Sequence, residues 1–341
     1  MLLAAKHVTP EGLTGKVIDI HSHVGVSLKA YACLEYPYGQ SLEGLYYRQI
    51  AAGVDVNVVF PYSPDLFFEV NGLVEGDMVP AAHPLSSVPY GTENRMLMSE
   101  IFVFCPELRE RFLPFVSVDP ARKVREQIRK MEELESEFPI YGIKISPVLC
   151  QSKVIGLLDR GRDFLEFARQ RDIPFLLHVS CDPNEGYSQA EDAFKVIERN
   201  QDLRFCLAHC ISFDKGFLEL ADGYPNVWVD TAALKIQVQM VHDDSPLVPP
   251  ASARFDADYS DHKAVMIALA ERFPDTIIWG TDSPAYSYIC RRKQGEGSYA
   301  EFRLKAVYED EKEALDALPE ELRLKACNIN SVRFLFGEAA G

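Results

Sequence analysis

Two histidines one residue apart stand near the start of the chain, in the stretch VIDIHSHVG at residues 17–25. Alternate side chains of a β-strand point to the same face, so His21 and His23 are expected to lie side by side, with Asp19 one layer deeper on that face. Imidazole is the commonest protein ligand for zinc and related metals. The spacing therefore predicts a pair of metal ligands at a strand end, with Asp19 contacting a ligand rather than the metal.

Four further residues of metal-ligand or acid–base type stand in or at the end of other apolar runs. They are Lys144 in GIKIS, His178 in FLLHVS, His209 in CLAHC and Asp282 in WGTDS. The chain has eight histidines, and four of them fall at such places, which chance placement would rarely produce. These residues are the expected remainder of the site.

The alternation within each run predicts where these side chains point. His178 is expected to share a face with Leu176, and Asp282 to share one with Gly280. His209 is expected to share its face with Phe205 and Leu207. All of these faces can turn to one interior, so the sequence predicts that the candidate residues converge.

The elements that must position these residues alternate regularly. Short apolar runs rich in β-branched and aromatic residues occur at 16–23, 56–63, 111–119, 141–148, 173–180, 204–210, 226–233 and 276–283. Amphipathic segments with helical spacing lie between them, for example at 121–138, 157–171, 189–200 and 261–273. Eight such units predict a (β/α)8 barrel as a single domain over residues 1–341. An open doubly wound sheet is the alternative, but no glycine-rich nucleotide motif follows any strand.

A barrel of this type keeps its catalytic groups at the carboxyl ends of its strands. Long strand-to-helix loops are expected near 24–48, 64–92, 234–260 and 284–299. Loops of this length are typical of lids and substrate walls. The predicted site therefore has both candidate catalytic groups and segments able to enclose a small molecule.

Composition limits the partners of the 341-residue chain. Its formal net charge is −16, with 47% hydrophobic and 25% charged residues, which argues against nucleic acid or an anionic membrane as the main partner. No apolar run reaches the length of a membrane span, and the first residues lack the apolar core of a signal peptide. Eight scattered cysteines without a CxxC pair indicate reduced thiols and a cytoplasmic protein. A small-molecule substrate is expected, and assembly into a homo-oligomer is left open.

The ordered motifs resemble the amidohydrolase superfamily, which carries HxH on its first strand, histidines on the fifth and sixth, and aspartate on the eighth. The stretches VIDIHSHVG, GIKISP, PFLLHVS, FCLAHC and IIWGTDSP carry the likeness, and the closing KACNINSVRFLFG resembles a final helix of the family. The chain is most similar to the amidohydrolase-related branch that includes aminocarboxymuconate semialdehyde decarboxylase. This resemblance covers nearly the whole chain.

The resemblance implies that His21, His23, His178 and Asp282 bind one divalent metal and that His209 is catalytic. Three imidazoles and a carboxylate suit zinc, and also manganese, iron or cobalt. A metal would lower the pKa of a bound water, and Asp282 could take the proton of that water and pass it to a leaving group. His209 could orient the water or polarise a carbonyl oxygen of the substrate.

Lys144 has three competing interpretations. In binuclear members of the superfamily a lysine on the fourth strand is carboxylated and bridges two metals. The resembled branch is mostly mononuclear, which favours a cation that holds a carboxylate or phosphate of the substrate. A structural ion pair is the third interpretation.

The predicted reaction is hydrolysis of an amide, lactone or ester by a metal-activated water, with a carboxylate on the substrate left as an option. A metal-dependent decarboxylase using the same residues is the main alternative. The resembled decarboxylases carry a tryptophan close after the histidine of the fifth strand, whereas HVSCDPNEGYS has none, which favours hydrolysis. A metal-binding barrel without turnover is the remaining hypothesis, and fold alone does not exclude it.

Overall fold

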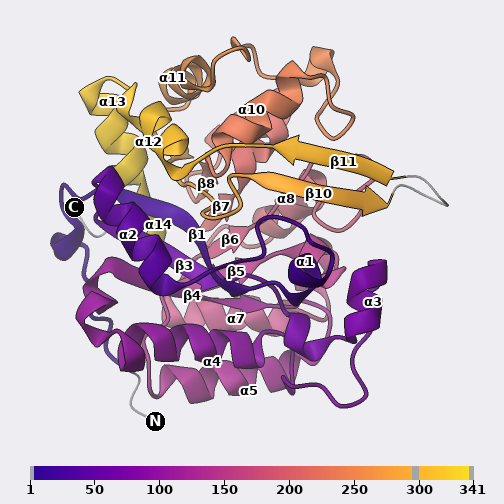
Figure 1. Ribbon diagram of the computed structural model, residues 1–341. Helices are drawn as coiled ribbons and strands as arrows, with labels where there is room; N and C mark the ends of the chain where they lie inside the picture. Colours follow the sequence, from indigo (N-terminus) through magenta and orange to yellow (C-terminus); the bar gives the residue numbers. More distant parts are fainter. Residues whose placement is uncertain (1–3, 294–298, 338–341) are drawn as a thin grey trace.

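Eight parallel strands form the centre of the computed structural model, which describes residues 4–293 and 299–337 (Figure 1). They are β1 (Ile18–Val26), β3 (Val56–Pro61), β4 (Phe112–Val118), β5 (Gly142–Ile145), β6 (Phe175–Leu177), β7 (Phe205–Leu207), β8 (Val227–Asp230) and β9 (Ile277–Ile278). Each pairs with the next in chain order. Seven of the eight predicted runs contain one of these strands whole, and β1 extends three residues beyond the run at 16–23.

Backbone hydrogen bonds between β1 and the residues that follow β9 close the sheet into a barrel. Ile20 N donates to Trp279 O at 3.2 Å, and His23 N donates to Ser283 O at 2.7 Å. Gly280 allows the two strands to approach, because a Cβ there would lie 3.0 Å from the Cβ of His21. The predicted (β/α)8 barrel is confirmed.

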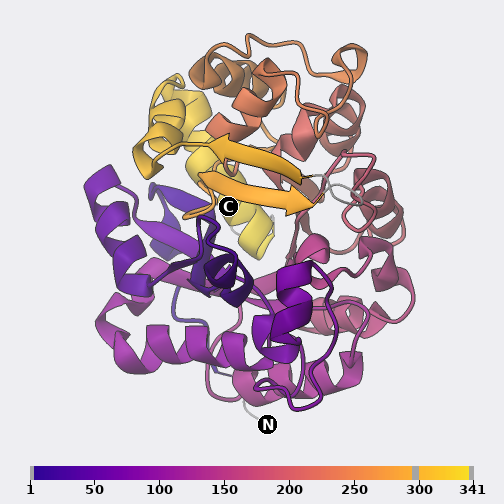
Figure 2. The same cartoon turned by 45° about the vertical axis from the view of Figure 1, so that its right-hand side comes forward.

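Helices surround the ring of strands (Figures 1 and 2). Those within or beside the barrel connections are α2 (Leu42–Ala52), α4 (Gly91–Ser99), α5 (Val124–Glu135), α7 (Arg162–Arg171), α8 (Ala190–Glu198), α9 (Lys215–Asp222), α10 (Leu234–His242), α11 (His262–Arg272), α12 (Tyr308–Asp316) and α14 (Asn330–Phe336). Shorter helices are α1 (Leu28–Ala32), α3 (Val70–Glu75), α6 (Pro147–Cys150) and α13 (Glu320–Leu324). The four segments predicted as helical contain α5, α7, α8 and α11.

The core consists of two layers separated by the strands. Alternate residues such as Val58, Leu176 and Ile278 form the cluster inside the barrel, which α14 extends with Phe334. Their neighbours along the strands, such as Leu177, pack outward with the helices. Both faces of the strands are therefore buried, as expected of parallel strands that are covered on both sides.

The segments predicted as long connections carry short elements of their own. Residues 24–48 hold α1 and the two-residue strand β2 (Gly39–Gln40), 64–92 hold α3, and 234–260 begin with α10. The fourth segment enters an antiparallel hairpin, β10 (Tyr288–Lys293) with β11 (Tyr299–Leu304), which lies in front of the strands in Figure 2. Residues 294–298 of that predicted loop lie outside the described residues. An isolated bridge between Tyr36 and Ile289 ties the hairpin to the segment after β1.

Candidate metal centre

The strand ends bring three of the predicted ligands into one group. His21 and His23 lie on β1, and Asp282 follows β9 across the barrel closure. One donor atom from each lies within 4.8 Å of the others. Asp282 Oδ1 is 3.3 Å from His21 Nε2 and 3.1 Å from His23 Nε2. All three residues are buried.

The donor atoms of this group fit a divalent cation. Asp282 Oδ1 is buried, and within the described part of the chain it makes no hydrogen bond of good geometry. A buried carboxylate oxygen without a donor is costly unless a cation satisfies it. Two imidazole nitrogens and one carboxylate oxygen are also the donor types that zinc and its neighbours take.

Burial sets the protonation of the group. It lowers the pKa of His21 well below its ordinary value, aided by the charge of Lys144, and it lowers the pKa of His23 as well. Burial also acts to raise the pKa of Asp282, but the imidazoles of His21 and His23 more than offset this and lower it to about 2. Neutral imidazoles beside an ionised carboxylate are the states that a metal requires.

Lys144 lies at the edge of the same group. Its Nζ is 3.3 Å from His21 Nε2 and 4.7 Å from the centre of the Phe60 ring. Burial lowers the pKa of Lys144 to about 8, although Asp230 and Asp282 act to raise it. Lys144 therefore lies inside the barrel, where the sequence predicts that the candidate residues converge.

His178 and His209 form a second pair beside the group. His178 Nδ1 lies 3.0 Å from His209 Nε2, and His209 Nδ1 lies 3.0 Å from Ala232 O. A carbonyl oxygen only accepts hydrogen bonds, so Nδ1 of His209 carries the hydrogen and its Nε2 has the lone pair. His178 does not belong to the three-residue group described above.

His209 reaches the interior by a different route from the predicted one. Phe205 and Leu207 pack outward against the helices, and Cys206 belongs to the inner cluster, so the predicted shared face is wrong. After β7 the residues His209–Phe213 all have positive φ, from 48° to 61°. This left-handed turn redirects the His209 side chain, and none of its residues is glycine, so it costs about 1–2 kcal/mol per residue.

Asp19 also lies on the face opposite to the one predicted. The pairing of β1 with β3 shifts register between Asp19 and Ser22, which places one extra residue on β1. Such a bulge breaks strict alternation. Asp19 therefore points outward to Tyr308 of α12, at 3.2 Å, while His21 and His23 point inward.

Asp230 is a buried residue whose role the sequence left undecided. It lies at the end of β8, and its Oδ2 is 2.9 Å from His21 Nδ1. Its Oδ1 accepts from the backbone N–H groups of His209, at 2.9 Å, and Ala232, at 3.1 Å. Its alternation with the outward-packing Val229 was the signal that could have placed it inside.

Aromatic rings line one side of the centre. The Phe60 ring lies 4.7 Å from the His23 ring between centroids, and the Tyr62 ring lies 5.0 Å from it. The Tyr62 hydroxyl donates to Pro37 O at 3.1 Å. These rings, at and just after the end of β3, form an apolar wall against which a substrate can pack.

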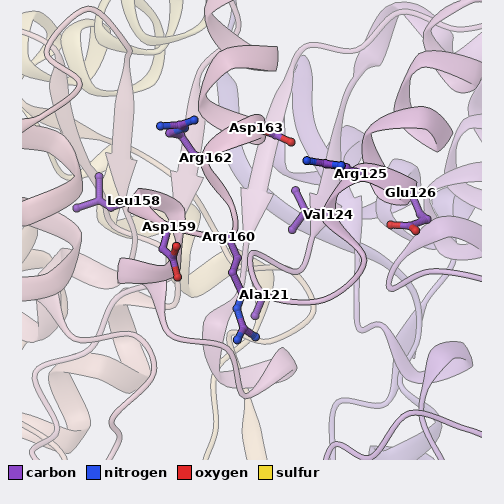
Figure 3. Close-up of a pocket in the computed structure, with 9 residues that line it drawn as sticks. All are labelled: Ala121, Val124, Arg125, Glu126, Leu158, Asp159, Arg160, Arg162 and Asp163. Carbon is purple, nitrogen blue, oxygen red and sulfur yellow. The ribbon is translucent and has the colours of Figure 1, made fainter.

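A surface groove of about 530 Å³ lies elsewhere, at the starts of α5 and α7 (Figure 3). Arg125, Arg160 and Arg162 line it together with Asp159 and Asp163. None of the six predicted site residues contributes to its lining. The groove is therefore separate from the candidate metal centre.

Comparison with known families agrees with the motif order. The amidohydrolase family model matches residues 73–337, a range that includes Lys144, His178, His209 and Asp282. The chain belongs to the amidohydrolase family. Members of this family generally use a divalent metal, and the predicted membership of an enzyme family is confirmed. No curated protein in the comparison matches this amidohydrolase.

Solved structures share its fold at low sequence identity. A protein of Pseudomonas putida provisionally assigned as a 2-pyrone-4,6-dicarboxylic acid hydrolase is 17% identical, with TM-score 0.54 over 94% of this chain and 97% of that one. A 2,6-dihydroxybenzoate decarboxylase from Rhizobium is 15% identical, with TM-score 0.54 over 94% and 98%. The 4-oxalomesaconate hydratase of Rhodopseudomonas palustris is 15% identical, with TM-score 0.53 over 94% and 95%. At these identities the likeness concerns the fold.

Among the described residues, no helix is both long and apolar enough to cross a bilayer.

Proposed function

We propose that this amidohydrolase is a metal-dependent hydrolase of a small carbonyl substrate that bears a carboxylate. The observation that carries the proposal is the buried group of His21, His23 and Asp282, whose carboxylate oxygen Oδ1 lacks a hydrogen-bond donor. His178 is proposed as the fourth ligand. The hydrogen that its Nδ1 directs to His209 leaves Nε2 with the lone pair that a ligand needs.

A divalent cation held there, with zinc as the first candidate, would supply Lewis acidity and lower the pKa of a bound water. The chain's own residues account for the proton movements. Asp282 is ionised at neutral pH, so its carboxylate can accept a proton and return it to the leaving group. His209, the proposed catalytic histidine, has its lone pair on Nε2, where it accepts the hydrogen of His178 Nδ1 and so holds the ring of that proposed ligand in place.

Lys144 is proposed to bind a carboxylate of the substrate. Its buried Nζ beside His21 is a cation within reach of the reacting centre, and a charged hydrogen bond in such a place is strong. The three structural neighbours described above are named for compounds that are carboxylic acids, which supports this class of substrate. The aromatic wall of Phe60 and Tyr62 would pack against the remaining, apolar part of the substrate.

A substrate screen tests this proposal. Carboxylate-bearing lactones, amides and esters are incubated with zinc-, manganese- and cobalt-loaded protein. Proton release is followed for lactones and esters, and amine release for amides. The same reactions are monitored for carbon dioxide. Hydrolysis that a chelator abolishes and added metal restores is the expected result. Carbon dioxide release without hydrolysis would overturn it in favour of decarboxylation, the alternative reaction for the same residues.

A further inference from the structure

We propose that Asp230 is a positioning residue that fixes which nitrogen of His21 faces the metal. This inference rests on the proposed function, since it concerns the same ligand group. Asp230 lies at the end of β8 and is buried, as is His21. Its carboxylate does not itself belong to the group of His21, His23 and Asp282.

The two carboxylate oxygens of Asp230 have different partners. Oδ1 accepts two backbone N–H groups, from His209 at 2.9 Å and from Ala232 at 3.1 Å. Backbone N–H groups can only donate, so this oxygen position must be an acceptor. The orientation of the carboxyl plane is thereby fixed by the backbone after β7 and β8.

The other oxygen, Oδ2, faces His21 Nδ1 at 2.9 Å. A carboxylate oxygen accepts, so Nδ1 of His21 carries the hydrogen and Nε2 is left with the lone pair. Nε2 is also the atom that lies 3.3 Å from Asp282 Oδ1. The ring is therefore held with its lone pair directed at the metal group, in the arrangement of carboxylate, histidine and metal that raises ligand basicity.

The same carboxylate acts on His209 through the backbone. His209 N is held by Oδ1 of Asp230, and Ala232, whose N–H binds the same oxygen, accepts from the His209 ring at 3.0 Å. One side chain thus ties the position of a proposed ligand to that of the proposed catalytic histidine. A replacement at Asp230 should affect metal affinity first and turnover with bound metal second.

The substitution Asp230→Asn tests this role directly, because the two backbone N–H groups determine how the asparagine amide is oriented. The two N–H groups require the amide oxygen at the Oδ1 position, so the amide NH₂ group is placed against His21 Nδ1. That nitrogen must then accept, and the hydrogen moves to Nε2, where it blocks the metal. The alternative orientation leaves two backbone donors facing an NH₂ group. We expect metal affinity to fall by about 10–100-fold.

The experiment uses the full chain with ¹⁵N-labelled histidine. In metal-free wild-type protein, the ¹⁵N shifts of His21 are expected to show hydrogen on Nδ1, and in Asp230→Asn on Nε2. Zinc affinity is measured for both by competition with a chelator of known affinity. Asp65→Asn is the matched control, since Asp65 is buried and accepts from Ser27 Oγ and Lys29 N rather than from a histidine. It should leave the His21 tautomer and the zinc affinity unchanged.

The outcomes separate this inference from the proposed function. A wild-type His21 with hydrogen on Nε2, or equal zinc affinity of wild type and Asp230→Asn, would overturn the role of Asp230 while leaving the metal site intact. Failure of the wild-type protein to bind zinc, manganese or cobalt would instead overturn the proposed function. If Asp230→Asn does not fold, the tautomer of wild-type His21 still decides the inference.

Discussion

Two buried aspartates beside the barrel closure differ in how their carboxylates are satisfied. Asp19, on the outer face of β1, accepts six hydrogen bonds, from His21 N, Ser22 Oγ, Asn57 Nδ2, Thr281 N, Thr281 Oγ1 and Tyr308 OH. Asp282, on the inner face of the same seam, has Oδ1 buried without a hydrogen bond among the described residues. The saturated carboxylate stabilises the fold, whereas the unsaturated one is arranged for a ligand.

This contrast shows how a barrel separates structure from function across a single strand. The bulge in β1 turns Asp19 outward, where it links β1, β3, β9 and α12. The residues that follow it, His21 and His23, turn inward and lie next to Asp282. Substitutions on the two faces should therefore have opposite consequences for stability and activity.

The largest effect is expected on the inner face. Asp282→Asn removes a proposed ligand and proton acceptor, so kcat/KM on a substrate found in the screen should fall by about 10³-fold or more. The free energy of unfolding of the metal-free variant should stay within about 1 kcal/mol of wild type, because the substitution removes a buried charge whose Oδ1 has no hydrogen bond to lose. Steady-state kinetics and urea unfolding measure the two quantities. A large loss of stability in the metal-free variant would contradict the contrast.

The outer face is expected to show the reverse. Asp19→Ala leaves several buried donors without an acceptor and should lower the free energy of unfolding by about 3–5 kcal/mol. Urea unfolding of metal-free protein measures it. The control is Asp55→Ala, which removes a partly buried carboxylate that accepts from Val17 N on the approach to β1 and should cost about 1 kcal/mol. Equal losses in the free energy of unfolding would show that the hydrogen-bond network at Asp19 stabilises the fold no more than the single bond at Asp55.

A second unsaturated carboxylate, Glu93 on α4, extends the comparison to the pH dependence of stability. Glu93 accepts from Leu66 N, while its Oε2 is buried without a partner among the described residues. Burial raises the pKa of Glu93 to about 7. Its protonated form is favoured in the folded state, so the stability it contributes is complete below about pH 4.5 and is lost as the pH rises through 7.

The stability of the wild-type protein should thus decline by about 2 kcal/mol between pH 5 and pH 8 through this group. Glu93→Gln should remove that part of the decline, whereas Glu126→Gln, at an exposed position of α5, should not. Chemical unfolding over this pH range is the measurement. Parallel profiles for wild type and Glu93→Gln would show that Glu93 is not the group responsible.

The smallest expected effect concerns the left-handed turn that carries His209. Ser212 has φ of 53°, a conformation that glycine adopts without strain. Ser212→Gly should therefore raise the free energy of unfolding by about 1 kcal/mol, measured by urea unfolding. Thr231→Gly, on the neighbouring strand end, serves as the control and should be destabilising. A loss of stability in Ser212→Gly would mean that the turn is not strained.

Sequence patterns predicted the features that depend only on residues close together in the chain. All eight barrel strands follow from apolar runs, the family follows from the resemblance of the ordered motifs, and His21, His23 and Asp282 were identified as neighbours. The register shift in β1 was not predictable, because an extra residue in a strand leaves no mark in the alternation, and so Asp19 was assigned to the wrong face. The turn after His209 was missed for a related reason: it lacks the glycines that usually mark left-handed backbone.

Two further features depend on contacts between distant segments. Asp230 acquires its role only when the barrel brings the end of β8 close to His21 and His209. Alternation along β8 could place its side chain inside the barrel, but not beside these two histidines. Strand β10 was predicted as part of a loop at 284–299, because the mixed polar and charged side chains of this segment do not form an apolar run. That His178 is a ligand and that Lys144 binds substrate remain predictions.

Metal analysis of the purified wild-type chain and of Asp282→Ala and Lys144→Ala tests the central claim most directly. The account predicts about one zinc, manganese or iron per wild-type chain, lost in Asp282→Ala and kept in Lys144→Ala. Two metals per chain, falling with Lys144→Ala, would replace the single-metal centre by a lysine-bridged pair. Wild-type protein that holds no divalent metal, even after incubation with zinc, manganese, iron and cobalt, would contradict the account.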